Sequence, residues 1–447
     1  MEEKKFGYHP NISYIFIPLN FGNTDDFQKV CAELNACDAW TQENSQHKYM
    51  LRYVSDKFNS SNPDQCRCFH FSLNDSVRSR AGIAEADEWY STRQYICREN
   101  PAETFPFRIL GTELFCFASS VCIMAFKISF RSNNPLTISA AQFYLKKVSA
   151  EKICVNSDND SVAQKTTFLD MAKKLVSFPE ISVNFNFFCF SNDNRERSNI
   201  LTYIEVENKE NYKEELFYLR RCYNDGFIYF DDDELNKKEN YAPSPDTHWG
   251  ITSEAAVCLA CPGKGREKFI KSVFYKNFNT QYLFTYVLLL HQKYALYTFL
   301  SKLGNSTDND LETLEKYQHE LYEFETDFVF SYITEVPQYQ HLYTRIYEAF
   351  HIDRIFEDVN EPIKALSEVR RNDTEKSQKK RDGRINTLLV VISVFSVLST
   401  LSDCHDYISS LLSSIAQASV ISFVQFALLG FTLASIIFFA CKLAKKE

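Results

Sequence analysis

Two long uncharged stretches near the C-terminus constrain this chain more than any other feature of its sequence. Residues 385–402 read INTLLVVISVFSVLSTLS, and no charged residue occurs between 407 and 441. At ~1.5 Å of rise per residue, a helix of either stretch crosses most of a hydrocarbon layer about 30 Å thick. The pattern predicts a transmembrane hairpin with helices at 385–402 and 417–441, an outer loop at 403–416 and a basic tail at 442–447.

Charges on either side of these stretches indicate their orientation. Basic residues precede the first stretch and follow the second, whereas the connection between them carries only acidic charges. Cytoplasmic ends of membrane helices carry an excess of Lys and Arg. We therefore predict a multi-pass protein of the cell inner (plasma) membrane, with the lipid bilayer as a partner and with both termini in the cytoplasm. The basic residues are Lys376, Lys379, Lys380, Arg381, Arg384, Lys442, Lys445 and Lys446.

A row of polar residues runs along the first stretch. Asn386, Ser393 and Thr400 are seven residues apart, and a second series follows three residues after each of them. On a helix both series share one face, and polar groups in lipid must turn towards other helices or water. The face predicts a pore formed by several copies of the chain, hence a homo-oligomer that conducts inorganic cations. The predicted pore-lining residues are Asn386, Leu389, Ser393, Ser396, Thr400 and Asp403.

The row also has a simpler interpretation. Ser and Thr hydroxyls often bond back to carbonyls of their own helix, and the row would then pack on the second stretch with no channel. If the pore exists, Leu389 is the one apolar member of the row and would act as a dewetting gate.

The first 265 residues alternate between strand and helix patterns. Runs rich in Ile, Val, Phe and Tyr predict strands, and apolar residues at three- and four-residue spacing predict helices between them. We expect an α+β or α/β domain over residues 1–265, with a dense aromatic core, because the chain has 39 Phe and 25 Tyr but only 11 Gly. The predicted strands are 12–21, 68–73, 114–117, 121–130, 181–190, 200–206 and 251–260, and the predicted helices are 26–40, 137–148 and 167–178.

From about residue 267 the pattern is helical to the end of the chain. Two helices joined by a turn at Gly304 predict an antiparallel hairpin, which together with a short helix fills residues 266–350. Residues 351–384 are predicted as a stalk helix, because apolar side chains recur there at three- and four-residue steps. Alternatively these side chains pack on the protein's own helices, and Pro362 either kinks the stalk or marks its first turn. The seam consists of Ile352, Ile355, Val359, Pro362, Leu366 and Val369.

Composition and motifs argue against several functions. The formal charge of −9 and the pI near 5.6 disfavour nucleic-acid binding, which needs clustered Lys and Arg. No phosphate-loop, zinc-protease or serine-hydrolase motif occurs, so we predict no enzyme and no catalytic residue. The 14 cysteines are scattered behind an N-terminus without a signal-peptide pattern, which predicts reduced thiols.

Histidines, acidic clusters and cysteine pairs form catalytic or metal sites in many proteins, but each also has a simpler structural interpretation in this sequence. Isolated His70, His248 and His291 are expected in the core or at interfaces. The acidic clusters at 231–234 and 308–310 could hold a hard cation through oxygen atoms, but such runs are usually just solvated. The pairs Cys258/Cys261 and Cys66/Cys68 lack two further ligands for zinc and are expected to be buried thiols.

The order of these parts resembles the CorA-like divalent-cation transporter superfamily over the whole chain. The best local matches are YLFTYVLLLHQKYALYTFL at 282–300, KKRDGRIN at 379–386 and KLAKKE at 442–447. The resemblance implies a homopentamer whose first span lines a pore for divalent cations such as Mg²⁺ and whose cytoplasmic domain gates it. The Gly-Met-Asn tripeptide of the family is absent, since 401–406 reads Leu-Ser-Asp-Cys-His-Asp. Selectivity for Mg²⁺ does not follow, and Asp403 would attract cations instead.

Two alternative functions stay open. Motif-poor CorA-like proteins also occur as membrane effectors of type III CRISPR antiviral defence, in which a nucleotide second messenger binds the cytoplasmic domain. The enlarged, aromatic-rich N-terminal region is compatible with such a ligand. In the other alternative the hairpin only anchors a scaffold or signalling protein in the membrane, without transport. Stoichiometry distinguishes a pore from an anchor, because a monomer or a dimer cannot line a pore with this row.

Overall fold

The structure is a computed structural model of the 447-residue chain. It describes residues 7–43, 48–58, 65–92, 104–155, 165–177, 182–188, 196–207, 210–305 and 311–412, together with residues 427 and 430. The chain divides into two compact units, Met1–Lys364 and Ala365–Glu447. The boundary between them falls inside one long helix, α12 (Ile352–Leu412), and all strands of the described residues belong to the first unit.

A mixed sheet of 12 strands organises the first unit. Its main path is β10-β11-β12-β9-β1-β6-β5-β3-β2, in which neighbours are antiparallel except for the parallel pair β9 and β12. The short strands β4, β7 and β8 pair outside this path. The bounds are β1 (Asn11–Asn20), β2 (Trp40–Gln42), β3 (Cys68–Leu73), β4 (Tyr90–Thr92), β5 (Pro106–Phe117), β6 (Val121–Phe130), β7 (Ile153–Val155), β8 (Asn186–Phe187), β9 (Asn199–Glu205), β10 (Asn240–Ser244), β11 (Thr247–Ile251) and β12 (Ala255–Ala260).

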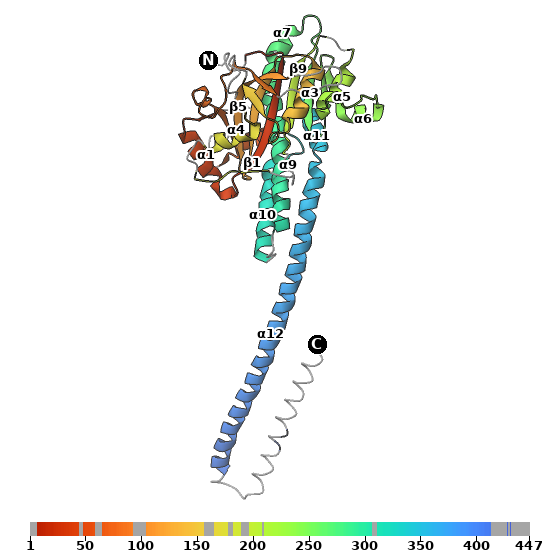
Figure 1. The fold of residues 1–447 in the computed structure, drawn as a ribbon. Helices are drawn as coiled ribbons and strands as arrows, with labels where there is room; N and C mark the ends of the chain where they lie inside the picture. The colour runs from red at the N-terminus through yellow and green to blue at the C-terminus, as the bar shows by residue number, and fades with distance from the viewer. Residues whose placement is uncertain are drawn as a thin grey trace. The chain divides into compact units, whose positions relative to one another are not determined.

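Both faces of the central strands are buried, so each face needs its own layer of helices. Every residue of β6 is buried, as is every residue of β1 except the last. On one face, side chains such as Ile15 and Met124 share a core with α1, α3, α4 and α5. On the other face, Phe16 and Ile123 share a second core with α2, α9 and α11. Figure 1 shows α9 and α11 beside the sheet. The helices are α1 (Phe27–Ala36), α2 (Arg52–Phe58), α3 (Pro135–Leu145), α4 (Phe168–Ser177), α5 (Tyr212–Arg221), α6 (Asp233–Glu239) and α11 (Pro337–Ala349).

Local sequence explains where some of these helices begin. Asn134 accepts hydrogen bonds from the backbone N–H groups of Leu136 and Thr137, and Pro135 occupies the first turn, so α3 starts there. The Asp232 carboxylate caps α6 in the same way through Glu234 and Leu235. These caps satisfy N–H groups that have no partner within the helix.

A helical run from Glu267 to Asn305 covers the second face of the sheet. It consists of α7 (Glu267–Phe269), α8 (Tyr275–Asn277) and α9 (Leu283–Asn305), with π-helical turns at Ile270–Phe274 and Phe278–Tyr282 between them. Residues 281–290 are all buried, which explains why apolar side chains predominate on every side of this stretch. α10 (Leu311–Phe328) lies antiparallel to α9, because Lys302 pairs with Glu320 at 2.8 Å while Gln292 Nε2 donates to the Phe328 carbonyl at 2.5 Å.

α12 leaves the first unit as a single helix of 61 residues. His351, with a φ of 54°, adopts the left-handed conformation between α11 and α12. Ile352, Val359 and Ile363 are completely buried in the core that contains α9 and α11. The first part of the predicted seam therefore packs on the protein's own helices, whereas Val369 further along is exposed.

One finding shows that the predicted membrane hairpin is wrong. Among the described residues, no helix is both long and apolar enough to cross a membrane. In the structure 385–402 is not a separate segment. It continues α12 after the charged run that precedes it, and residues 403–412 follow in the same helix. Hydropathy averaged over a short segment does not show that the apolar segment and the charged run before it form one helix. The second predicted span, 417–441, and the tail, 442–447, lie outside the described residues apart from 427 and 430.

The fold class and the location are corrected accordingly. The chain is a mixed α/β protein with a large sheet and one long helix, rather than an α/β domain with stalk helices and a C-terminal transmembrane hairpin. The predictions of a multi-pass protein of the inner membrane, of transmembrane helices and of a channel lose the spanning segment that they require.

Gly250 in β11 offers a test of the packing between the sheet and α5. A Cβ atom at this position would lie 3.1 Å from Arg220 Cβ and 3.2 Å from both Arg220 Cδ and Leu216 Cδ2. We expect Gly250→Ala to lower the free energy of unfolding by about 1–3 kcal/mol, measured by urea denaturation, because neither neighbour has room to retreat. Gly111 in β5 is the control, since a Cβ there meets nothing within 4 Å. An equal loss in Gly111→Ala would contradict the packing argument.

Candidate functional site

The six predicted pore-lining residues all lie on α12. Asn386, Leu389, Ser393, Ser396 and Thr400 are exposed, and Asp403 follows in the same helix. The Ser393 hydroxyl donates to the Leu389 carbonyl at 2.7 Å, and the Thr400 hydroxyl donates to the Ser396 carbonyl at 2.6 Å. These hydroxyls thus find partners within their own helix, as the simpler interpretation of the row expected. Within a single chain, the structure brings the six residues together only as one face of a helix.

Large apolar side chains surround this row. Between Ile385 and Val397 they are 46–67% exposed, and Phe395 is the most exposed of them. No side chain of the described residues covers them. Monomeric soluble proteins rarely expose so many large apolar side chains next to one another. The exposed side chains are Ile385, Leu388, Leu389, Val391, Ile392, Phe395 and Val397.

A cavity of about 300 Å³ lies in the first unit between α9, α10 and the turn that joins β5 to β6. Phe299, Phe324 and Phe328 supply apolar walls, and Ser119 belongs to the turn. Two ion pairs lie at its wall: Arg67 Nε is 2.8 Å from an Asp327 oxygen, and Lys302 pairs with Glu320. These pairs tie α10 to the residue before β3 and to α9. Asp25 and Glu323 also line the cavity, so its carboxylates outnumber its cations.

Ser119 and His291 form a hydrogen-bonded pair behind the cavity wall. The Ser119 Oγ and His291 Nε2 atoms are 2.6 Å apart, and the ring of His291 stacks on Phe117 with centroids 3.9 Å apart. Burial lowers the pKa of His291 well below its usual value, so the ring is neutral at pH 7. The imidazole is completely buried and does not line the cavity, so it has no access to the leaving group of a bound substrate. The pair is placed to hold α9 against the β5–β6 turn.

The other histidines and acidic clusters also have structural partners. His70 Nε2 lies 3.0 Å from a Glu113 oxygen, and His248 stacks on Tyr212. Of the acidic cluster 231–234, Asp232 caps α6, while 308–310 lies outside the described residues. In the part of the chain that the structure describes, no group of three His, Cys, Asp or Glu side chains is arranged to hold a metal ion. Cys66, Cys68, Cys258 and Cys261 are buried thiols that form no disulfide.

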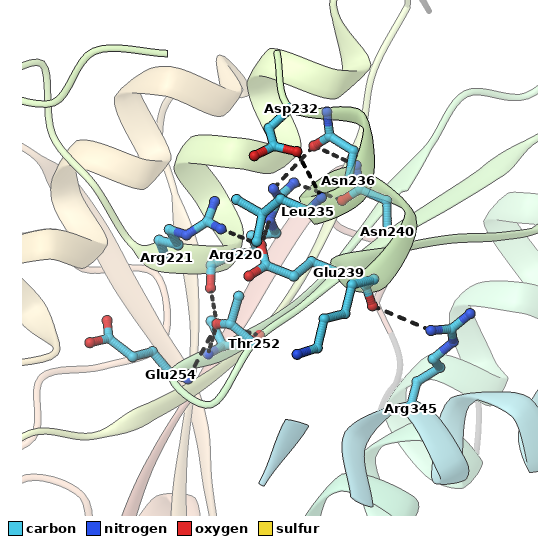
Figure 2. Close-up of polar contacts among 12 residues, drawn as sticks. Arg220, Arg221, Asp232, Leu235, Asn236, Glu239, Asn240, Thr252, Glu254 and Arg345 are labelled. Atoms are coloured by element: carbon cyan, nitrogen blue, oxygen red, sulfur yellow. Dashed lines mark hydrogen bonds and ion pairs between the residues drawn. The ribbon is translucent and has the colours of Figure 1, made fainter. Parts of the chain in front are cut away.

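Arg220 is the centre of a buried polar network (Figure 2). Its guanidinium group is completely buried; Nε donates to Glu239 at 2.6 Å, and one terminal nitrogen donates to Asn240 at 2.7 Å. Arg221 pairs with the same carboxylate, and the other terminal nitrogen of Arg220 donates to Asn236 at 3.2 Å. These contacts join α5, α6 and β10 and satisfy all three nitrogens of the Arg220 guanidinium group, whereas one terminal nitrogen of Arg221 is buried without a hydrogen-bond partner among the described residues.

Lys127 is a second buried charge, and sequence reasoning missed it. It is 8% exposed in the middle of β6, and burial lowers its pKa to about 8 despite the opposing effect of Glu113. The signal was present in the sequence, because VCIMAFKISF holds one charged residue in ten. A lone lysine in an otherwise uncharged central strand indicates a buried cation that needs compensation. Arg220, by contrast, gave no such signal, since it belongs to a charged pair at a helix end.

No family model, no curated protein and no solved structure matches this chain. The resemblance to the CorA-like superfamily therefore stays a prediction from sequence.

The Arg220 network predicts a large effect of neutralising one carboxylate. We expect Glu239→Gln to lower the free energy of unfolding by about 3–5 kcal/mol, because the buried guanidinium of Arg220 loses its countercharge. Glu234→Gln, on the exposed surface of the same helix, should change stability by less than about 0.5 kcal/mol. Chemical denaturation of both variants measures the difference, and similar values for the two would show that Arg220 does not depend on Glu239.

His291 predicts a pH dependence of stability. Its folded pKa lies below the unfolded value near 6.5, so the unfolded chain binds a proton first as the pH falls. The contribution is present above pH 6.5 and is lost below it, by up to about 1.4 kcal/mol per pH unit. Denaturation between pH 7.5 and 5 should therefore show a shallower loss in His291→Gln than in the wild type. The exposed His319→Gln is the control and should keep the wild-type slope; a wild-type slope in His291→Gln would refute the assignment.

Proposed function

We propose that this chain is a homo-oligomeric protein in which α12 joins several copies and the α/β unit regulates the assembly. The exposed apolar surface of α12 between Ile385 and Val397 is the observation that supports this proposal. A helix that is apolar on nearly every side is stable in water only when other elements cover it. We take a further copy of the same chain to be the covering partner.

The spacing of the exposed residues fits association between identical helices. Ile385, Leu388, Ile392 and Phe395 follow one another at steps of three, four and three residues. This is the spacing of the a and d positions of a coiled coil, with Ile at a and Leu or Phe at d. The row of hydroxyls through Ser393 lies beside this seam on the helix, so it can face the centre of a bundle whose helices meet along the seam.

The hydrophobic effect favours covering this surface. Burying a Leu, Ile, Val or Phe side chain completely contributes about 1.5–3 kcal/mol. The seven exposed side chains are each about half covered by their own helix, so their burial contributes roughly 5–10 kcal/mol per chain. Part of this is offset by lost translational and rotational freedom.

The attachment of α12 supports a regulatory role for the first unit. Ile352, Val359 and Ile363 fix the first turns of the helix in the same core as α9 and α11. A ligand that altered the packing of this core would alter the direction in which the helix leaves the unit. In this way the α/β unit would influence how the helices of several copies meet.

This proposal keeps two elements of the sequence-based functions, the homo-oligomer and the control by the N-terminal domain. Cation conduction, CRISPR defence at a membrane and anchoring in a membrane each assume a spanning hairpin, which the described residues do not provide. The pentamer implied by the CorA-like resemblance becomes one expected value of the stoichiometry, and the measurement below determines it.

Light scattering coupled to gel filtration tests the proposal on the full-length chain. We expect the wild type to be a defined oligomer, and the triple variant Leu388→Ser, Ile392→Ser, Phe395→Ser to shift by at least tenfold towards monomer at equal concentration. The reason is that the variant removes three of the four seam residues.

Ile228→Ser is the matched control, because Ile228 is 76% exposed on the first unit and lies outside the seam. This variant should keep the wild-type mass, and circular dichroism should show an unchanged melting temperature of the first unit in both proteins. A monomeric wild type, or a triple variant with the wild-type mass, would refute assembly through α12.

A further inference from the structure

The cavity between α9, α10 and the β5–β6 turn has aromatic walls. Phe299, Phe324 and Phe328 line it, and these side chains are otherwise buried, at 8%, 3% and 2% exposure. Neighbouring ring centroids are 6.0 and 5.8 Å apart, so the three rings form one continuous surface. The cavity volume of about 300 Å³ lies at the lower end of the range of small-molecule sites. The cavity therefore offers an apolar interior of a size that suits a small ligand.

Carboxylates surround this interior at two depths. Asp25, in the segment that precedes α1, is exposed, and the Glu323 side chain on α10 is 62% exposed. The side chains of Asp327 and Glu320 are only 21% and 15% exposed. A ligand entering from the solvent therefore meets Asp25 and Glu323 first and the aromatic rings further inside.

The two less exposed carboxylates are neutralised within the chain. Asp327 lies 2.8 Å from Arg67 Nε and 2.5 Å from Lys57 Nζ, and Glu320 lies 2.8 Å from Lys302 Nζ. Arg67 and Lys302 line the cavity, and each is already part of an ion pair. Asp327 and Glu320 therefore need no cation from a ligand.

Asp25 and Glu323 differ from these two carboxylates. Asp25 accepts a hydrogen bond from the Asn23 side-chain amide at 3.4 Å, and Glu323 lies 3.4 Å from the exposed ring of His319. Within the ranges that the structure describes, no Lys or Arg side chain pairs with Asp25 or Glu323. Two different elements thus present carboxylates to one cavity without a lysine or arginine to balance them.

Lys302 shows how the wall of this cavity holds a cation. Its ammonium group pairs with Glu320 and also lies over the rings of Phe299 and Tyr317, at 5.6 and 5.8 Å from their centroids. An aromatic face attracts a cation electrostatically, and a carboxylate adds an ion pair with hydrogen bonds. The cavity offers both kinds of group a second time, and there the described chain supplies no cation.

Other classes of ligand fit the cavity less well. An anion would meet four carboxylates, whereas the cations of the wall, Arg67 and Lys302, already have partners. A metal ion needs several ligands at one point, and no three His, Cys, Asp or Glu side chains of the described residues are arranged to hold one. A cation with an apolar body can contact both the carboxylates and the rings.

We propose that this cavity binds a small organic ammonium ion, with its carbon chain against the Phe rings and its ammonium group at Asp25 or Glu323. The ammonium group donates hydrogen bonds to carboxylate oxygens, and the carbon chain leaves water when it contacts the rings. A diamine has one ammonium group for each of the two carboxylates. Binding does not depend on assembly through α12, so either proposal can fail without the other.

Calorimetric titration of the full-length chain at low ionic strength tests the site with putrescine, butylamine and butanol. We expect saturable binding of both amines and none of butanol, which has the carbon chain of butylamine without its charge. Tighter binding of putrescine means that both carboxylates take part, and equal affinity of the amines means that one does. Both outcomes support the site. No saturable binding of either amine, or butanol binding as tightly as butylamine, would overturn it.

A pair of double variants makes the test specific. Asp25→Asn with Glu323→Gln removes both accessible carboxylates and should weaken putrescine binding at least tenfold, with an unchanged melting temperature. Glu312→Gln with Glu315→Gln is the matched control, because it removes the same charge from exposed positions of α10 that do not line the cavity. Equal weakening in both proteins would refute the site. Magnesium ions binding as tightly as putrescine would show a general attraction of cations and would also refute it.

Discussion

The burial of both faces of β1 and β6 is the constraint on which the first unit depends. A strand buried on one face needs one layer of helices, but these two strands are apolar on both faces and need two layers. The layer with α3 and α5 covers one face, and the run from α7 to α9 covers the other. α12 starts inside this second layer, so the position of its first turns follows from the same requirement.

Double burial also determines where charge is tolerated. Arg220 and Arg78 are buried, and side-chain or backbone oxygens accept hydrogen bonds from each guanidinium group. Such networks fix one arrangement of the elements that they join, because losing one partner exposes the full cost of a buried charge. Lys127 lies in a central strand, and its burial lowers its pKa to about 8 despite the opposing effect of Glu113.

Sequence reasoning located the strands that carry their own signal. The predicted strands at 121–130 and 68–73 coincide with β6 and β3, and 12–21 differs from β1 by one residue, because these runs are apolar and bounded by turn residues. The predicted strand at 251–260 instead spans the end of β11, a turn and β12, since one apolar run continued through the turn. The contacts of Arg220 were not predictable, because they join residues brought together by strand order, which local patterns do not encode.

The wrong prediction of a membrane hairpin and the correct strand predictions rest on the same signal, which is the apolar character of a short segment. A window over 385–402 measures how apolar a segment is, but not what element it belongs to or what covers it. In the structure the segment continues a helix that is fixed in the α/β core at one end and carries a charged run before the apolar surface. Charged residues on all sides keep the part around Lys376 in water, whereas the apolar part around Ile392 requires a covering surface. The first turns of α12 are held by the core of the first unit, whereas its apolar part around Ile392 needs a further surface to cover it. That second requirement is the physical reason to expect α12 to be a contact surface.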